Sequence, residues 1–114
     1  MPFINSKISV KLDEEKEKAI KQRLGQAIRI FPGKSETYLM VGFEEDYNLY
    51  FQGKKCEKAA FVEVRLFGNA DSRACEQMTA EISRIYEEEL GISPANLYIS
   101  YQPVANWGWN GANL

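Results

Sequence analysis

A weak internal repeat restricts the fold of this chain more than any other feature of its sequence. Each copy begins with an extended apolar segment, continues into a helix with an acidic start, and returns through a glycine-containing turn to a second extended segment. In the first copy, residues 3–10 predict a strand, and Asp13 can cap a helix whose apolar residues recur at three- and four-residue spacing up to Phe31. Gly33 then marks a turn, and residues 37–43, rich in aromatic and β-branched side chains, predict a largely buried strand.

The second copy follows the same order. Residues 59–67 alternate between apolar side chains on one face and partly polar ones on the other, as in a strand with one buried face. Asp71 or Ser72 opens the next helix, and Gly91 stands where a left-handed C-terminal cap belongs. Residues 97–101 predict the fourth strand.

Two β-α-β units with right-handed connections predict an α/β (α+β) fold, with a four-stranded sheet and both helices on one face. We expect residues 1–114 to form a single domain. The third predicted strand turns Phe61, Glu63 and Arg65 toward the face that no helix covers. That face needs a partner, so we expect a symmetric oligomer in which sheets face one another. The polar connection 44–58, which contains several aromatic residues, is expected to contact a neighbouring subunit.

Composition excludes several classes of function. The 14 basic residues are nearly balanced by 16 acidic ones, and no basic run is interleaved with aromatic residues, so we expect no nucleic-acid partner. No apolar run approaches the ~18–20 residues of a membrane span, and no secretory leader is recognisable. We expect a protein without a membrane partner that is cytoplasmic or exported without a signal peptide. Cys56 and Cys75 form neither a disulfide framework nor a metal or redox motif and are interpreted as structural thiols.

Pro2 is the candidate base of a chain that contains no histidine. Removal of Met1 would expose a secondary amine, and an α-amino group titrates near ~7.7–8.0. A pKa lowered by roughly one unit, through an apolar site or a nearby cation, would make this amine a base at neutral pH. The alternative is structural, because the fixed φ of proline suits the first position of an edge strand. If Pro2 is considered without the rest of the sequence, this structural role is the favoured interpretation.

Several short motifs, in their order and spacing along nearly the whole chain, resemble those of the macrophage migration inhibitory factor family of the tautomerase superfamily. The resemblance implies a homotrimer of double β-α-β subunits, an active site at each subunit interface, and an N-terminal proline as the catalytic base. The motifs that carry it are Pro2-Phe-Ile, Gly33-Lys34, Gly91-Ile-Ser-Pro94, Leu97-Tyr-Ile99 and Asn106-Trp-Gly-Trp-Asn110.

The same resemblance assigns the site residues. Pro2 matches the catalytic proline and Lys34 the pocket lysine, while Tyr98 matches a tyrosine that a neighbouring subunit contributes. Ser100 stands where relatives often have a substrate-binding asparagine. Glu63 matches, within one position, a residue whose backbone contacts ligand.

Two tryptophans complete the implied pocket. Trp109 matches a family tryptophan, and Trp107 replaces a smaller apolar residue. Without the resemblance, these residues and Tyr98 would be interpreted as core or interface aromatics, and Lys34 as an exposed lysine at a helix end.

The resemblance implies a keto–enol tautomerase that needs no metal or other cofactor and acts on a small aromatic α-keto acid of the phenylpyruvate type. Pro2 would move the proton, and Lys34 would attract the carboxylate and stabilise enolate charge. The aromatic side chains would enclose the ring, and Ser100 would donate one orienting hydrogen bond.

Two alternatives stay open. The first is a secreted cytokine-like protein that binds a receptor and retains vestigial tautomerase activity. Vertebrate members carry a Cys-x-x-Cys pair, whereas here Cys56 is followed by Ala59, so we expect no dithiol mechanism. The second is a hydratase or dehalogenase of small unsaturated acids, for which Glu63 and Arg65 offer a carboxylate and an arginine.

Overall fold

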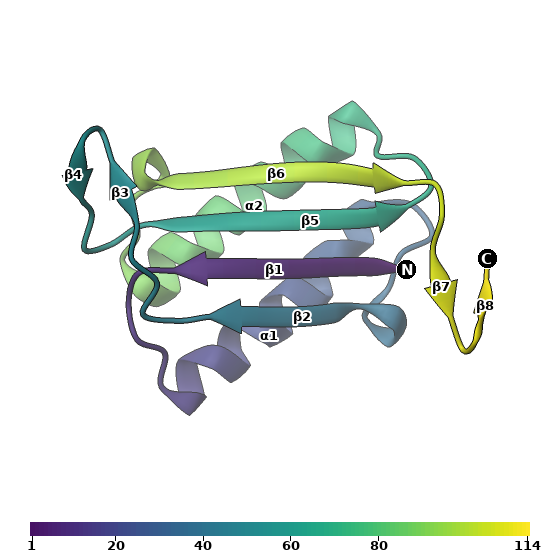
Figure 1. The fold of residues 1–114 in the computed structure, drawn as a ribbon, viewed down its shortest axis with the longest axis horizontal. Coiled ribbons are helices and arrows are strands. Elements are labelled where there is room, and N and C mark those ends of the chain that lie inside the picture. Colours follow the sequence, from purple (N-terminus) through teal and green to yellow (C-terminus); the bar gives the residue numbers. More distant parts are fainter.

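A computed structural model describes residues 1–114, and it contains a four-stranded mixed sheet in the order β2-β1-β5-β6 (Figure 1). The strands are β1 (Pro2–Ile8), β2 (Met40–Glu44), β5 (Ala60–Phe67) and β6 (Leu97–Val104). β1 runs parallel to β2 and antiparallel to β5, and β5 runs parallel to β6. Each parallel pair is one β-α-β unit, so the repeat in the sequence is the repeat in the fold.

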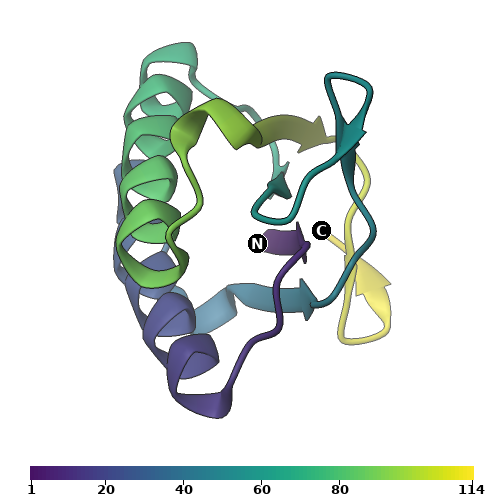
Figure 2. The same ribbon diagram turned by 90° about the vertical axis from the view of Figure 1, so that its left-hand side faces the viewer.

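Two helices, α1 (Glu14–Ala27) and α2 (Ser72–Leu90), lie together on one face of the sheet (Figure 2). This arrangement confirms the predicted fold class. Neither helix combines the length and the hydropathy that a membrane span requires.

The predicted helix caps are confirmed in detail. The carboxylate of Asp13 accepts a hydrogen bond from the Lys16 amide at 2.7 Å. At the second helix the cap is Asp71, whose carboxylate accepts a hydrogen bond from the Ala74 amide at 3.0 Å. Gly91 ends α2 with φ of 66°, a left-handed conformation that costs glycine little because it has no Cβ.

The core fills the space between the helices and the sheet. Val62 and Leu66 of β5 are fully buried, as the alternation of residues 59–67 predicted, and so is Ile4 of the neighbouring strand β1. The helices contribute the fully buried residues Ile20, Leu24, Met78, Ile82 and Ile85. The only buried polar side chain of the sheet, Ser6, is satisfied by a hydrogen bond with the hydroxyl of Tyr86. Burial of these apolar side chains is the main favourable contribution to the stability of the fold.

Some predicted boundaries were wrong. The helix predicted to reach Phe31 ends at Ala27 and continues as a 3-10 turn, η1 (Ile28–Ile30). The strand predicted over residues 37–43 begins only at Met40, because Glu36–Tyr38 form a second 3-10 turn, η2.

Two strand lengths also differ from the prediction. β1 stops at Ile8, and Ser9 instead bonds the backbone of Ala59. β6 continues past residue 101 to Val104, since its pairing with β5 persists up to Phe67.

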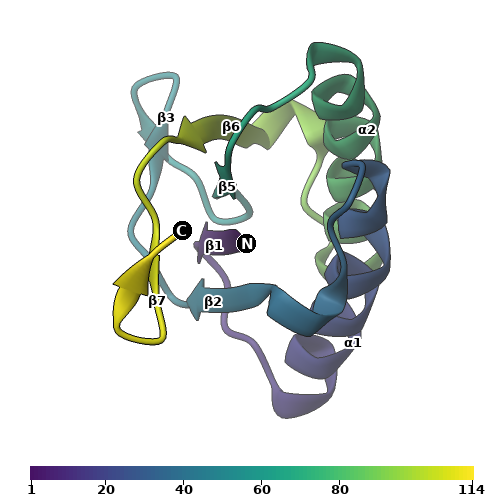
Figure 3. The ribbon, with the colours of Figure 1, turned by 90° about the vertical axis from the view of Figure 1, so that its right-hand side faces the viewer.

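Two short hairpins were not predicted. One, β3 (Tyr50–Phe51) with β4 (Lys54–Lys55), lies within the connection 44–58, and the other, β7 (Gly108–Trp109) with β8 (Ala112–Asn113), forms the tail. Figures 2 and 3 show both hairpins on the side of the sheet away from the helices.

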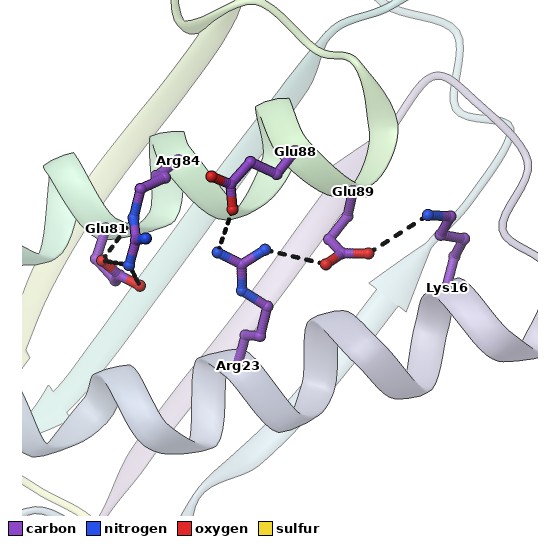
Figure 4. A network of polar contacts seen from close by, with 6 residues as sticks. All are labelled: Lys16, Arg23, Glu81, Arg84, Glu88 and Glu89. Atoms are coloured by element: carbon purple, nitrogen blue, oxygen red, sulfur yellow. Dashed lines mark hydrogen bonds and ion pairs between the residues drawn. The ribbon is translucent and has the colours of Figure 1, made fainter.

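The helices are also joined by an ionic network at the surface (Figure 4). The Arg23 guanidinium of α1 donates to Glu88 at 2.7 Å and to Glu89 at 3.0 Å on α2. Lys16 lies 3.4 Å from the other oxygen of Glu89. These hydrogen bonds, first of all that from Arg23, hold the pKa of the Glu89 carboxyl below its ordinary value.

We expect Arg23→Ala to lower the free energy of unfolding by about 1 kcal/mol at pH 7, because it leaves two neighbouring carboxylates without their shared cation. The lowered pKa of Glu89 means that this contribution is present above the unfolded-state pKa of ~4.3 and is lost as the pH falls through the folded-state value. Urea unfolding at pH 7 and pH 3 measures both effects. Arg84→Ala is the matched control, because Arg84 pairs only with Glu81 of its own helix and should have a smaller effect. Equal losses for the two variants would contradict the interhelical role.

Candidate active site

A cavity of about 660 Å³ is lined by residues at the start of β1 and in the tail hairpin. Figures 1 and 3 show these two segments at the same end of the sheet. The cavity forms where the chain terminus, the η2 turn, β5 and the tail meet, so its wall combines segments that are far apart in the sequence. Most of its lining is apolar. The lining residues are Met1, Pro2, Phe3, Thr37, Tyr38, Leu39, Met40, Arg65, Val104, Trp107, Gly108 and Trp109.

Pro2 is buried in the wall of this cavity as the first residue of β1, where it pairs with Leu66 of β5. Met1 precedes it, and the Met1 carbonyl accepts a hydrogen bond from the Phe67 amide at 3.0 Å. Partial burial, and then the nearby charge and hydrogen bond of Lys34, lower the pKa of the Met1 amine below its ordinary value. The environment at this terminus therefore favours a neutral amine.

Lys34 reaches the same place from the connection between η1 and η2, within the first β-α-β unit. Gly33, with φ of 76°, turns the chain after η1, and the Lys34 ammonium then donates to the Phe67 carbonyl at 3.0 Å. Lys34 does not itself line the cavity but lies beside the Met1 amine. The structure thus brings Lys34 close to the terminus that Pro2 would occupy after loss of Met1.

The two predicted tryptophans form part of the cavity wall. Trp109 packs edge-on against Tyr38, with ring centroids 5.6 Å apart, and Trp107 packs against Phe67 at 6.4 Å. Tyr38 and Met40 were not among the predicted site residues, although both line the cavity and are largely exposed. The cavity offers flat apolar surfaces suited to an aromatic ring.

Arg65 also lines the cavity and was not assigned to substrate binding from the sequence. It lies on the open face of β5, where it pairs with Phe3, next to the residue that pairs with Pro2. Its side chain is 49 % exposed, and its one ion pair, with Glu63, is long at 3.9 Å. The positive charge of Arg65 therefore faces the cavity and is only weakly balanced by a neighbouring carboxylate.

The other three predicted residues lie outside the cavity of their own protomer. Tyr98, on β6, is 58 % exposed and packs edge-on against Phe51 of the β3–β4 hairpin, with ring centroids 5.2 Å apart. Ser100 follows on the same face and pairs with Glu63, whose carboxylate lies 3.2 Å from Lys7. A site that includes these residues would need them from another subunit.

The family model described as macrophage migration inhibitory factor (MIF) matches residues 1–114. The chain belongs to the MIF family. This confirms the resemblance found in the sequence. No match was found among curated proteins.

Solved structures agree with this assignment. MIF2 of Leishmania major is 32 % identical, with a TM-score of 0.93 over 100 % of this chain and 97 % of that one. The MIF of Toxoplasma gondii is 20 % identical, with a TM-score of 0.90 over 98 % of this chain and 99 % of that one. The protein Pt0534, in a structure described as inactivated by 2-oxo-3-pentynoate, is 18 % identical, with a TM-score of 0.81 over 96 % and 92 %. The last two comparisons establish similarity of fold.

The structure explains why three cavity residues were not predicted from the sequence. Tyr38 is the last residue of η2 and Met40 the first of β2, whereas residues 37–43 were predicted to form one continuous strand. Arg65 was recognised as a residue of the open sheet face, but only the pairing of Pro2 with Leu66 places it beside the chain terminus. No short-range sequence signal reports that register.

Proposed function

We propose that this MIF-family protein is a cofactor-independent keto–enol tautomerase acting on small aromatic α-keto acids of the phenylpyruvate type. Membership of the family supports a tautomerase or MIF-like function in general. The observation that favours the specific reaction is the position of Pro2, in the wall of an aromatic cavity and next to Met1, whose amine lies beside Lys34. Aromatic walls suit the ring, and the cation suits the carboxylate.

The reaction needs one base and one source of positive charge. With Met1 removed, the neutral Pro2 amine takes a proton from the carbon next to the ketone, and the electron pair of that C–H bond moves toward the ketone oxygen. The ammonium formed on Pro2 then returns a proton to the oxygen, which gives the enol. No atom is gained or lost overall, and the amine is regenerated.

Lys34 has the capacity for the electrostatic part of this reaction. An ammonium has three N–H donors, and one of them is engaged by the Phe67 carbonyl. Once Met1, whose amine also contacts Lys34, is removed, the other two are available to a substrate carboxylate or to the developing enolate. The bond to Phe67 also fixes the ammonium at the end of β5, near the terminus that would carry the base.

A panel of α-keto acids with and without an aromatic ring tests the proposal, combined with intact-mass analysis of Met1 removal. We expect the protein without Met1 to convert phenylpyruvate faster than pyruvate. Absence of turnover for every α-keto acid by protein with a free Pro2 amine would reject the enzymatic function.

We propose a homotrimer as the active assembly. Family members are typically oligomeric, and the open face of the sheet, which carries Phe61, Glu63 and Arg65 without a helix over it, supports an oligomer here. Pro2 pairs with Leu66, which pairs with Pro103 of β6, so Tyr98 and Ser100 lie five and three residues further along that strand. A second subunit would have to supply them to a site at Pro2. Sedimentation equilibrium at micromolar concentration should report three times 13.0 kDa. A monomer would reject both the trimer and the shared site.

The cavity supplies only one of the two residues considered for the hydratase or dehalogenase alternative, because Arg65 lines it and the carboxylate does not. Glu63, the carboxylate considered for it, lies outside the cavity of its protomer and is paired with Lys7. No Asp or Glu is among the residues that line the cavity.

A further inference from the structure

We propose that Arg65 is a second anion-binding residue of this cavity and selects substrates that carry an acidic group in addition to the α-keto carboxylate. This inference rests on the proposed tautomerase function. It identifies Arg65 as a specificity-determining residue and the preferred substrate as a dianion.

The first argument is the position of Arg65 relative to the base. Pro2 pairs with Leu66, and the neighbours of Leu66 along β5 are Arg65 and Phe67. The Phe67 carbonyl holds the Lys34 ammonium. Residues two apart on a strand are roughly 6.5 Å apart, so the backbone anchors of the two cations stand on either side of the residue opposite Pro2.

The second argument is the lack of a strong partner for the Arg65 guanidinium. Its contact with Glu63 is at 3.9 Å, whereas the other oxygen of Glu63 lies 3.2 Å from Lys7. Glu63 therefore interacts more closely with Lys7 than with Arg65. A guanidinium has five donors in a planar fork that matches a carboxylate, so most of the hydrogen-bonding capacity of Arg65 is unused.

The third argument is charge balance in the cavity. The wall contains no carboxylate, and two cations lie at or beside it. A substrate with one carboxylate can neutralise one of them, whereas a second acidic group on the body of the substrate can neutralise the other. Arginine is suited to this second position because it binds a carboxylate through two parallel hydrogen bonds, while lysine acts as a point charge.

The test compares phenylpyruvate with (4-carboxyphenyl)pyruvate, which have the same ring and differ by one carboxylate. For the protein without Met1, we expect a lower KM for the dianion. Arg65→Ala should lower kcat/KM for the dianion about fivefold to tenfold, mainly through KM, and should change kcat/KM for phenylpyruvate less than about threefold. Arg65→Lys should restore part of the preference. Arg84→Ala, which removes an arginine from the outer surface of α2, is the matched control and should change neither substrate.

Equal effects of Arg65→Ala on both substrates, or no effect on either, would overturn the proposal while leaving the tautomerase function intact. Loss of the oligomer in Arg65→Ala, with full retention of the dianion preference in a neutral Arg65→Gln variant that still assembles, would also overturn it and assign Arg65 to the subunit interface. Failure of the proposed function itself is distinguishable, because the parent protein would then turn over neither substrate.

Discussion

A variant that carries one additional residue in front of Pro2 is expected to lose phenylpyruvate tautomerisation by at least about a hundredfold, because it lacks the general base. In this variant the Pro2 nitrogen is a tertiary amide without a basic lone pair. The new terminal amine is displaced by one residue, about 3.8 Å between consecutive Cα atoms. Proton transfer depends on alignment at hydrogen-bond distance, so this amine is not an adequate substitute.

The loss should occur without a change of fold, since Met1 already occupies this position in the structure and its carbonyl accepts a hydrogen bond from the Phe67 amide. Enol absorbance measures activity, and circular dichroism and sedimentation measure fold and assembly. The control is protein of the unextended sequence whose mass shows a free Pro2. Full turnover by the extended, still assembled variant would eliminate Pro2 as the base and favour a binding function.

Substitution of Lys34 by alanine is expected to lower kcat/KM for phenylpyruvate at pH 7 roughly tenfold or more, because a charged hydrogen bond to the substrate is lost. It should also move the pH profile. In the structure, Lys34 lowers the pKa of the Met1 amine, after the larger effect of burial. We expect Lys34 to act in the same direction on the pKa of the Pro2 amine once Met1 is removed. Activity depends on the neutral amine and rises as the pH passes its pKa, so removal of the cation should shift this rise to higher pH.

Lys34→Arg is the conservative control, because it keeps the charge near the amine and should retain the pH profile of the parent. Stability should fall by only about 1 kcal/mol in Lys34→Ala, which is the contribution of one hydrogen bond to the Phe67 carbonyl. Identical kinetics and pH profiles for Lys34→Ala and the parent would show that Lys34 is a structural surface charge.

The sheet and both helices were predictable because their signals are local and periodic. Asp13, Asp71 and Gly91 mark helix ends through hydrogen bonds and backbone conformation that involve only a few neighbouring residues. The start of β2 was not predictable in this way. Thr37 and Tyr38 have side chains that favour strands. The pairing of β1 with β2 nevertheless begins only at Phe3 and Met40, so residues 37 and 38 have no partner in β1.

The two hairpins had a local signal that was overlooked. Asn110 and Gly111 form the turn between β7 and β8 with φ of 54° and 81°, and Asn-Gly is a strong signal for this kind of turn. Gln52 and Gly53 adopt similar values, 55° and 77°, between β3 and β4. Glycine-rich tails with aromatic residues look irregular unless such dipeptides are considered first.

For the candidate site, only the family resemblance named individual residues. Pro2, Trp107 and Trp109 line the cavity and Lys34 lies beside the Met1 amine, whereas the other assigned residues lie outside the cavity. The roles of all of them in binding and catalysis stay predictions. Arg65 reaches the cavity through the antiparallel register of β1 and β5, which connects residues that are more than sixty positions apart. A register of that kind depends on the packing of the whole sheet.

Because the Phe67 amide donates a hydrogen bond to the Met1 carbonyl, the loss of Met1 has a second structural consequence. Removal of the residue frees the nitrogen of Pro2 and, in the same event, takes away the acceptor of the Phe67 N–H. The Phe67 N–H, which had paired with the first residue of the chain, would then have no acceptor at the edge of the cavity. It lies beside the Phe67 carbonyl, which accepts a hydrogen bond from Lys34. Cleavage of the single bond between Met1 and Pro2 would thus expose two groups at the start of β1, the basic Pro2 amine and the hydrogen-bond donor of Phe67.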